Sequence, residues 1–225
     1  MSDQGPSKAD RERVRAVMGL PPGQRVVQVP NSTLVARLAD LTSLHRDFQM
    51  ARQFISAFAD LGRYEVEPDS PNQALWMTAV VMYARAFANG VRHAARPDVT
   101  VFDDEDRAAH DYLIAMRNKF IAHSVNAFEQ VSPFAVISGE AEETFKVVGV
   151  GTQLGMFARM SRAGALRLAS LCDIQMTEIN GRIEIARNEI KKELTRRGPR
   201  YVLGLPELGM VRVDESAVSR SRGNK

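Results

Sequence analysis

The sequence contains a single cysteine, Cys172, among its 225 residues. One thiol excludes an intramolecular disulfide and a zinc site built on paired thiolates. Cys172 falls within a helical apolar pattern, so we expect a buried and unreactive thiol. The four histidines lie far apart in the sequence, and none has the His-x-x-x-His spacing of a paired metal ligand. The sequence therefore predicts a protein without a metal or other cofactor.

Long apolar runs are also missing. None approaches the roughly 18 residues that a membrane-spanning helix needs, and residues 1–6 are polar, without the apolar core of a signal peptide. We therefore expect a cytoplasmic protein with no membrane contact. The formal net charge is only +3, which permits a local basic surface but does not require a nucleic-acid partner.

The residues that are present fit an ordinary globular protein, with 44% apolar and 25% charged residues. Their periodicity predicts a mainly α fold, a helical bundle with an inserted β-hairpin. We expect an N-terminal helix and linker over 1–30 and a helical domain over 31–198, with the hairpin at about 131–150. Residues 199–225 are expected to form a partly ordered C-terminal tail.

The expected helices have recognisable boundaries. Asn31-Ser32 offers an N-cap, Ser70-Pro71 places proline in a first helical turn, and Gly198-Pro199 stops the last helix. Apolar residues at spacings of three, four and seven mark the buried faces, and residues 74–91 are apolar nearly all round, as in a central helix. The helices are expected at about 8–18, 31–62, 70–91, 103–124 and 156–197.

Two β-rich runs, 134–137 and 145–148, flank Gly139 and predict the hairpin. Gly149, Gly151 and Gly155 are expected to end its second strand. They do not form a phosphate-binding loop, because no Gly-Lys-Ser/Thr follows them.

Four consecutive acids, residues 103–106, open the third helix. They suggest either a cation site or a helix N-terminus, where carboxylates cap backbone amides and favour the helix dipole. The second interpretation is favoured, because acids at this position are common without a metal.

Arg117, Asn118 and His123 carry the most informative chemistry. His123 continues an apolar face with Leu113 and Met116, so it is either a structural histidine that caps helix carbonyls or a functional group. Burying the Arg117 guanidinium among apolar residues is costly without a partner, which favours a cleft or an interface. A histidine moves protons near neutral pH, and an arginine grips phosphate oxygens through two parallel N–H bonds.

This segment resembles a known family. Arg117-Asn118-x-x-x-x-His123 matches the Arg-polar-x4-His motif of HEPN domains, helical nucleotide-binding domains found in many prokaryotic toxins and defence ribonucleases. The run from Met116 to Ser124 looks like the Arg-Asn-Lys-x-x-Ala-His form of the motif. The resemblance covers about residues 31–124 and the last long helix, and the hairpin is an addition to the basic helical pattern.

The resemblance implies a metal-independent endoribonuclease, often a homodimer whose two motifs face one cleft, although some members are not nucleases. His123 would then transfer protons, and Arg117 would hold and stabilise the phosphate. Asn118 would orient the side chain of either His123 or Arg117. We assign RNA binding to Lys119 and to Arg85 as well. Such a protein would serve as a toxin or antiphage effector, with an antitoxin as protein partner.

Two of these assignments have alternatives. Arg85 is either an RNA contact or the partner of an acid such as Asp111 or Glu129. A basic cluster at the end of the last helix either complements the helix dipole on a solvated face or contacts the RNA backbone. This cluster consists of Lys191, Lys192, Arg196, Arg197 and Arg200.

Helix geometry also bears on the site. On a regular helix, residues 117 and 123 are separated by about 9 Å of rise and a turn of about 240°. One regular helix therefore makes a loose phosphate clamp, and either a dimer or a break in the helix would improve it.

The alternative to an endoribonuclease is a non-catalytic helical module that binds a nucleotide, a nucleic acid or a protein.

Overall fold

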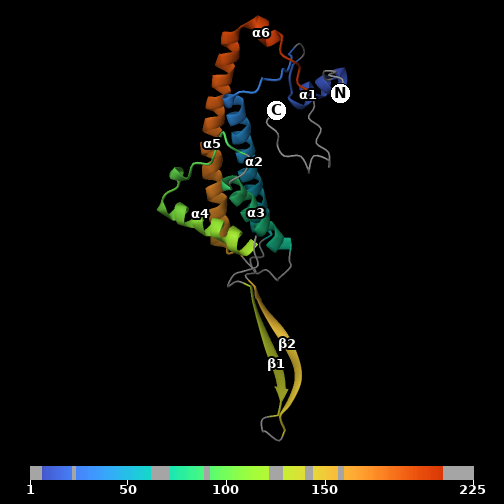
Figure 1. Cartoon of the computed structure of the whole chain (residues 1–225), viewed down its shortest axis with the longest axis vertical. Coiled ribbons are helices and arrows are strands. Elements are labelled where there is room, and N and C mark those ends of the chain that lie inside the picture. The colour runs from blue at the N-terminus through green and yellow to red at the C-terminus, as the bar shows by residue number, and fades with distance from the viewer. Residues whose placement is uncertain are drawn as a thin grey trace. The chain divides into compact units, whose positions relative to one another are not determined.

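The computed structural model describes residues 7–21, 24–61, 71–88, 92–121, 129–139, 144–156 and 160–209 (Figure 1). Within these ranges the fold is mainly helical, with one two-stranded antiparallel sheet, and the predicted fold class is confirmed. The chain divides into two compact units, and the long helices α2 and α5 contribute a segment to each. Unit 1 comprises Met1–Thr42, Gly90–Ala95 and Gly181–Lys225, and unit 2 comprises Ser43–Asn89 and Arg96–Asn180.

The helix boundaries follow local signals. The Ser32 hydroxyl accepts a hydrogen bond from the Val35 amide at 3.2 Å, which caps α2, and Pro71 is the first residue of α3. None of the described helices is long and apolar enough to cross a bilayer. The α-helices are α1 (Lys8–Val17), α2 (Thr33–Asp60), α3 (Pro71–Phe87), α4 (Asp104–Met116), α5 (Arg162–Arg197) and α6 (Pro199–Leu203), with a 3₁₀ turn, η1 (Val99–Val101), and a π-helical turn, η2 (Arg117–Ile121).

Unit 2 has an aromatic core between α2 and α3. Phe48, Trp76 and Tyr83 have no exposed surface. The Phe48 ring lies edge-on to Tyr83 at 5.7 Å and to Phe87 at 5.6 Å between centroids, an arrangement that favours aromatic pairs. The prediction of a central apolar helix is confirmed by α3. Cys172, on α5, is fully buried as expected.

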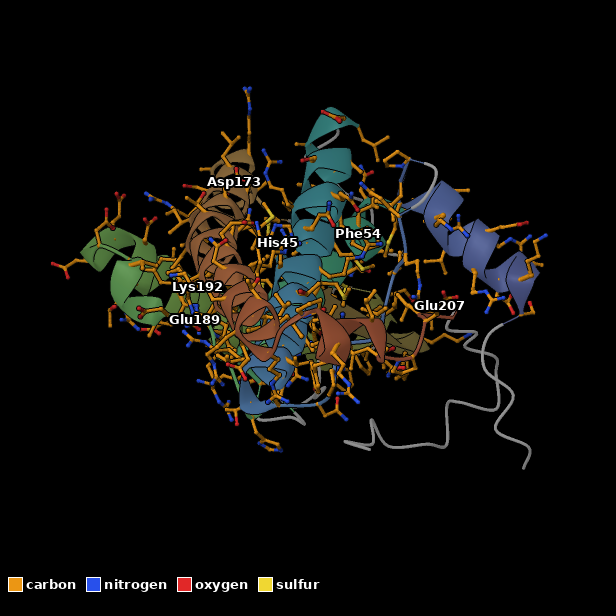
Figure 2. All side chains as sticks on the ribbon, turned by 90° about the horizontal axis from the view of Figure 1, so that it is seen from above. His45, Phe54, Asp173, Glu189, Lys192 and Glu207 are labelled. Atoms are coloured by element: carbon orange, nitrogen blue, oxygen red, sulfur yellow. The ribbon has the colours of Figure 1, made fainter. Side chains whose placement is uncertain are left out.

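Within unit 1, backbone hydrogen bonds and ion pairs hold the N-terminal segment against the C-terminal segment. The Gln28 amide donates to the Pro206 carbonyl at 2.8 Å, and the Leu208 amide donates to the Val26 carbonyl at 2.9 Å. Glu207, labelled in Figure 2, accepts from the guanidinium of Arg11 at 3.0 Å and from that of Arg25 at 2.9 Å. Part of the predicted C-terminal tail therefore belongs to this unit.

The hairpin is longer than the sequence indicated. It consists of β1 (Glu129–Ser138) and β2 (Lys146–Met156), with a bulge between Val136 and Ile137. The expectation that glycines end the second strand was wrong, because Gly149, Gly151 and Gly155 all lie within β2. Gly151 pairs with Phe134, and a Cβ at Gly151 would lie 2.6 Å from the Phe134 ring, so glycine leaves the ring room to cover the strand.

The start of α5 was also predicted wrongly. Because β2 continues to Met156, the helix begins at Arg162 rather than near residue 156. The Ser161 hydroxyl accepts a hydrogen bond from the Gly164 amide at 3.0 Å and supplies the N-cap. Gly198 has φ +81°, and this left-handed residue separates α5 from α6, as the predicted stop required.

Candidate functional site

The motif residues lie where α4 changes into a π-helical turn. Its α-helical part ends at Met116, and Arg117–Ile121 form η2, which packs beside α3. The prediction of one regular helix to about residue 124 was therefore wrong over Arg117–Ile121, and residues 122–124 lie outside the described ranges. His123 lies outside the described residues, so its predicted role stays a prediction.

Arg117 and Asn118 are brought together by η2. The Arg117 guanidinium donates through Nη1 to Asn118 Oδ1 at 3.0 Å. Arg117 is partly buried, whereas Asn118 and Lys119 are exposed, and Leu113 and Met116 on the preceding turns are buried. The guanidinium therefore stands at the solvent edge of the core, where it could reach a phosphate with its remaining donors.

The π-helical turn changes the geometry inferred for a regular helix. A π-helix has i→i+5 hydrogen bonds, so each residue turns by less than it does in an α-helix. The 240° offset calculated for a regular helix between positions 117 and 123 does not apply once Arg117–Ile121 are wound in this way. Single π-helical turns inside α-helices are frequent at functional sites.

Arg85 is held by a carboxylate that the sequence analysis did not name. Its Nη2 pairs with Asp47 Oδ1, and the Asp47 side chain is 3% exposed while that of Arg85 is 51% exposed. The alternative of an acid partner is therefore confirmed, with Asp47 in place of Asp111, and the side chain of Glu129 lies outside what the structure describes. An acid on α2 pairs with this residue of α3 because the two helices pack together in unit 2. Because about half of the Arg85 side chain is exposed, an RNA contact at this residue stays a prediction.

The acids at the start of α4 cap the helix and bind an arginine, and the predicted capping role is confirmed. Asp103 Oδ1 accepts from the Asp106 amide at 2.7 Å. Arg167 on α5 binds Glu105 at 2.7 Å and Asp106 at 2.8 Å. Over the described ranges, no group of three or more histidine, cysteine or acidic side chains is placed to hold a metal ion.

The chain matches no family model, no curated protein and no solved structure. The resemblance to HEPN domains therefore depends on Arg117, Asn118 and His123 in the sequence and on the position of Arg117 and Asn118 directly after α4.

A buried polar pair between α4 and α3 was not predicted from the sequence. His110 on α4 is 7% exposed, and its Nδ1 lies 2.9 Å from the hydroxyl of the fully buried Tyr83 on α3. The rings of Phe87 and Phe102 lie within 5.5 Å of the imidazole, centroid to centroid. Its spacing of four from Asp106 and three from Leu113 places His110 on the buried face, which was the available signal.

Burial lowers the pKa of His110 below its ordinary value, with Asp111 opposing this shift and Arg107 reinforcing it. The unfolded chain then takes up a proton below about pH 6.5 more readily than the folded one. We expect the free energy of unfolding to fall as the pH drops below that value, by at most about 1.4 kcal/mol per pH unit. Urea unfolding followed by Trp76 fluorescence at pH 7.5 and 5.5 measures this loss.

The matched control is His93→Gln, because His93 is exposed. His110→Gln should reduce the pH dependence, whereas His93→Gln should leave it unchanged. An equal loss of stability at low pH in wild type and His110→Gln would show that another group titrates.

Proposed function

We propose that the protein is a metal-independent endoribonuclease of the HEPN type. The observation that carries the proposal is the Arg117–Asn118 pair on the solvent edge of η2, followed by His123 in the sequence. These residue types supply phosphate binding, orientation and proton transfer without a metal. Lys119 and Arg85 are proposed to contact the RNA backbone.

The reaction assigns a separate task to each motif residue. The ribose 2′-oxygen attacks the adjacent phosphorus and gives its proton to His123, while the bond from phosphorus to the 5′-oxygen breaks. His123 returns this proton to the leaving 5′-oxygen, and the products carry a 2′,3′-cyclic phosphate and a 5′-hydroxyl. Arg117 stabilises the charge that develops on the phosphate oxygens, and Asn118 orients the guanidinium through the bond at 3.0 Å.

A homodimer is part of the proposal. Two copies related by a two-fold axis would place two Arg117 and two His123 side chains at one cleft. The biological setting proposed is that of a toxin or antiphage effector held in check by an antitoxin.

The deciding experiment incubates the purified protein with single-stranded RNA in excess EDTA. Cleavage should persist, because no metal takes part, and the products should carry cyclic phosphate ends. RNA with 2′-O-methyl riboses should remain intact, since its 2′-oxygen has no proton to lose. If no RNA is cut under any condition, the proposal fails and the non-catalytic module becomes the better hypothesis.

A further inference from the structure

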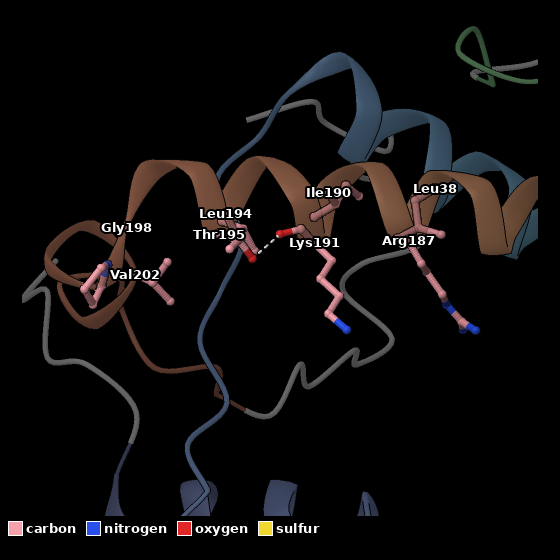
Figure 3. Close-up of a pocket in the computed structure, with 9 residues that line it drawn as sticks. Leu38, Arg187, Ile190, Lys191, Leu194, Thr195, Gly198 and Val202 are labelled. Atoms are coloured by element: carbon pink, nitrogen blue, oxygen red, sulfur yellow. Dashed lines mark hydrogen bonds between the residues drawn. The ribbon is translucent and has the colours of Figure 1, made fainter.

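Unit 1 contains an open apolar groove along the C-terminal part of α5, with a cavity volume of about 520 Å³. Figure 3 shows its lining side chains on α5, α2 and α6. We call it the α5 groove. It is lined by Leu38, Arg187, Ile190, Lys191, Leu194, Thr195, Gly198, Pro199 and Val202.

The floor of the α5 groove continues an apolar stripe that is buried in the preceding turns of α5. Ile183 and Ala186 are 6% and 1% exposed. Ile190 and Leu194 follow at the same helical spacing, yet both are only half-buried. From Arg187 to Gly198 the groove follows about three helical turns, or about 16 Å. An apolar stripe of this length is matched by one face of another helix.

The rim of the α5 groove is basic. Arg187 and Lys191 are four residues apart, both are exposed, and both line the groove. Arg187 has a carboxylate neighbour, Glu184, at 2.6 Å. Lys191 has no ion pair with any residue that the structure describes. A partner with carboxylates along one edge would complement this rim.

We propose that the α5 groove binds an acidic amphipathic helix of a partner protein. Leucine-like side chains at i, i+3, i+4 and i+7 would lie over Ile190 and Leu194, and flanking glutamates would face Arg187 and Lys191. RNA does not fit as well, because the apolar floor offers nothing to a phosphate backbone. The chain's own residues 210–225 do not complement the basic rim, because they carry four cationic and only two acidic side chains.

The test measures fluorescence anisotropy of a labelled synthetic helix of about 16 residues, with leucine at i, i+3, i+4 and i+7 and glutamate elsewhere. Wild-type full-length protein should bind this acidic probe and not a probe with lysine in place of glutamate. Lys191→Glu should weaken binding by at least about tenfold. Leu194→Glu should also weaken it, since the variant places a carboxylate on the apolar floor.

Lys192→Glu is the matched control, because Lys192 neighbours Lys191 on α5 but does not line the α5 groove. It should bind the acidic probe as wild type does. Equal weakening by Lys191→Glu and Lys192→Glu would mean nonspecific charge attraction and would overturn the proposal. Single-stranded RNA and dodecanoate, a fatty acid, are tested as competitors of the acidic probe. If either displaces the probe and its own binding depends on Lys191 and Leu194 in the same way, the proposal is overturned in favour of that ligand.

This measurement needs no RNA cleavage. A protein without nuclease activity can still bind the acidic probe, and an active nuclease can fail to bind it. The two proposals therefore fail separately.

Discussion

His123→Ala and Arg117→Ala are expected to lower the rate of RNA cleavage by about 10²–10⁴-fold and about 10²–10³-fold, respectively. The first removes the group that takes and returns protons. The second removes the donors that meet charge on the phosphate in the transition state. Initial rates on a fluorogenic single-stranded RNA in EDTA measure both effects.

Two further variants define what Arg117 does. Arg117→Lys keeps the positive charge but loses the planar fork, so we expect it to recover only part of the activity. Arg46→Ala removes an exposed guanidinium from α2, where it contacts Gln49 at 3.0 Å, and should leave the rate unchanged. Equal losses in Arg117→Ala and Arg46→Ala would argue that Arg117 acts through general charge and not at the reacting phosphate.

Mixing the two inactive variants tests the dimer. If each site takes Arg117 from one copy and His123 from the other, a mixed dimer keeps one intact site of two. Random exchange then restores roughly a quarter of the wild-type activity. If each copy holds a complete site, the mixture stays inactive, and the shared cleft is excluded.

Phe48→Ala is expected to lower the free energy of unfolding by about 3–5 kcal/mol, the largest effect on stability that we predict. Phe48 has no exposed surface, and the substitution leaves a cavity against Tyr83 and Phe87. Urea unfolding can be followed by Trp76, the only tryptophan, which lies in the same unit and is also fully buried.

The matched control is Phe145→Ala. It removes the same atoms from a side chain that is 55% exposed beside the hairpin, so its cost should stay within about 0.5 kcal/mol. If both substitutions cost the same, the aromatic cluster around Phe48 would not be the source of stability.

The sequence by itself determined the elements whose signals are local. Ser32, Pro71 and Asp103 mark helix starts, and Gly198 marks a stop, because a cap or a proline acts within one turn of its own position. The apolar stripes of α2 and α3 likewise identified the core, since burial follows helical periodicity. The motif Arg117, Asn118 and His123 was also readable, and it remains the basis of the proposed chemistry.

Only the tertiary structure decided features that depend on distant neighbours. Gly151 belongs to a strand because the Phe134 ring covers it, and Arg85 pairs with Asp47, 38 residues away in the sequence. The π-helical turn at Arg117–Ile121 and the open end of the α5 stripe also became visible only in three dimensions. The sequence therefore determined most of the helices, and it supplied the residues on which the proposed chemistry depends. Packing decided which side chains face each other and which apolar residues stay uncovered, because these depend on contacts between segments that no local pattern records.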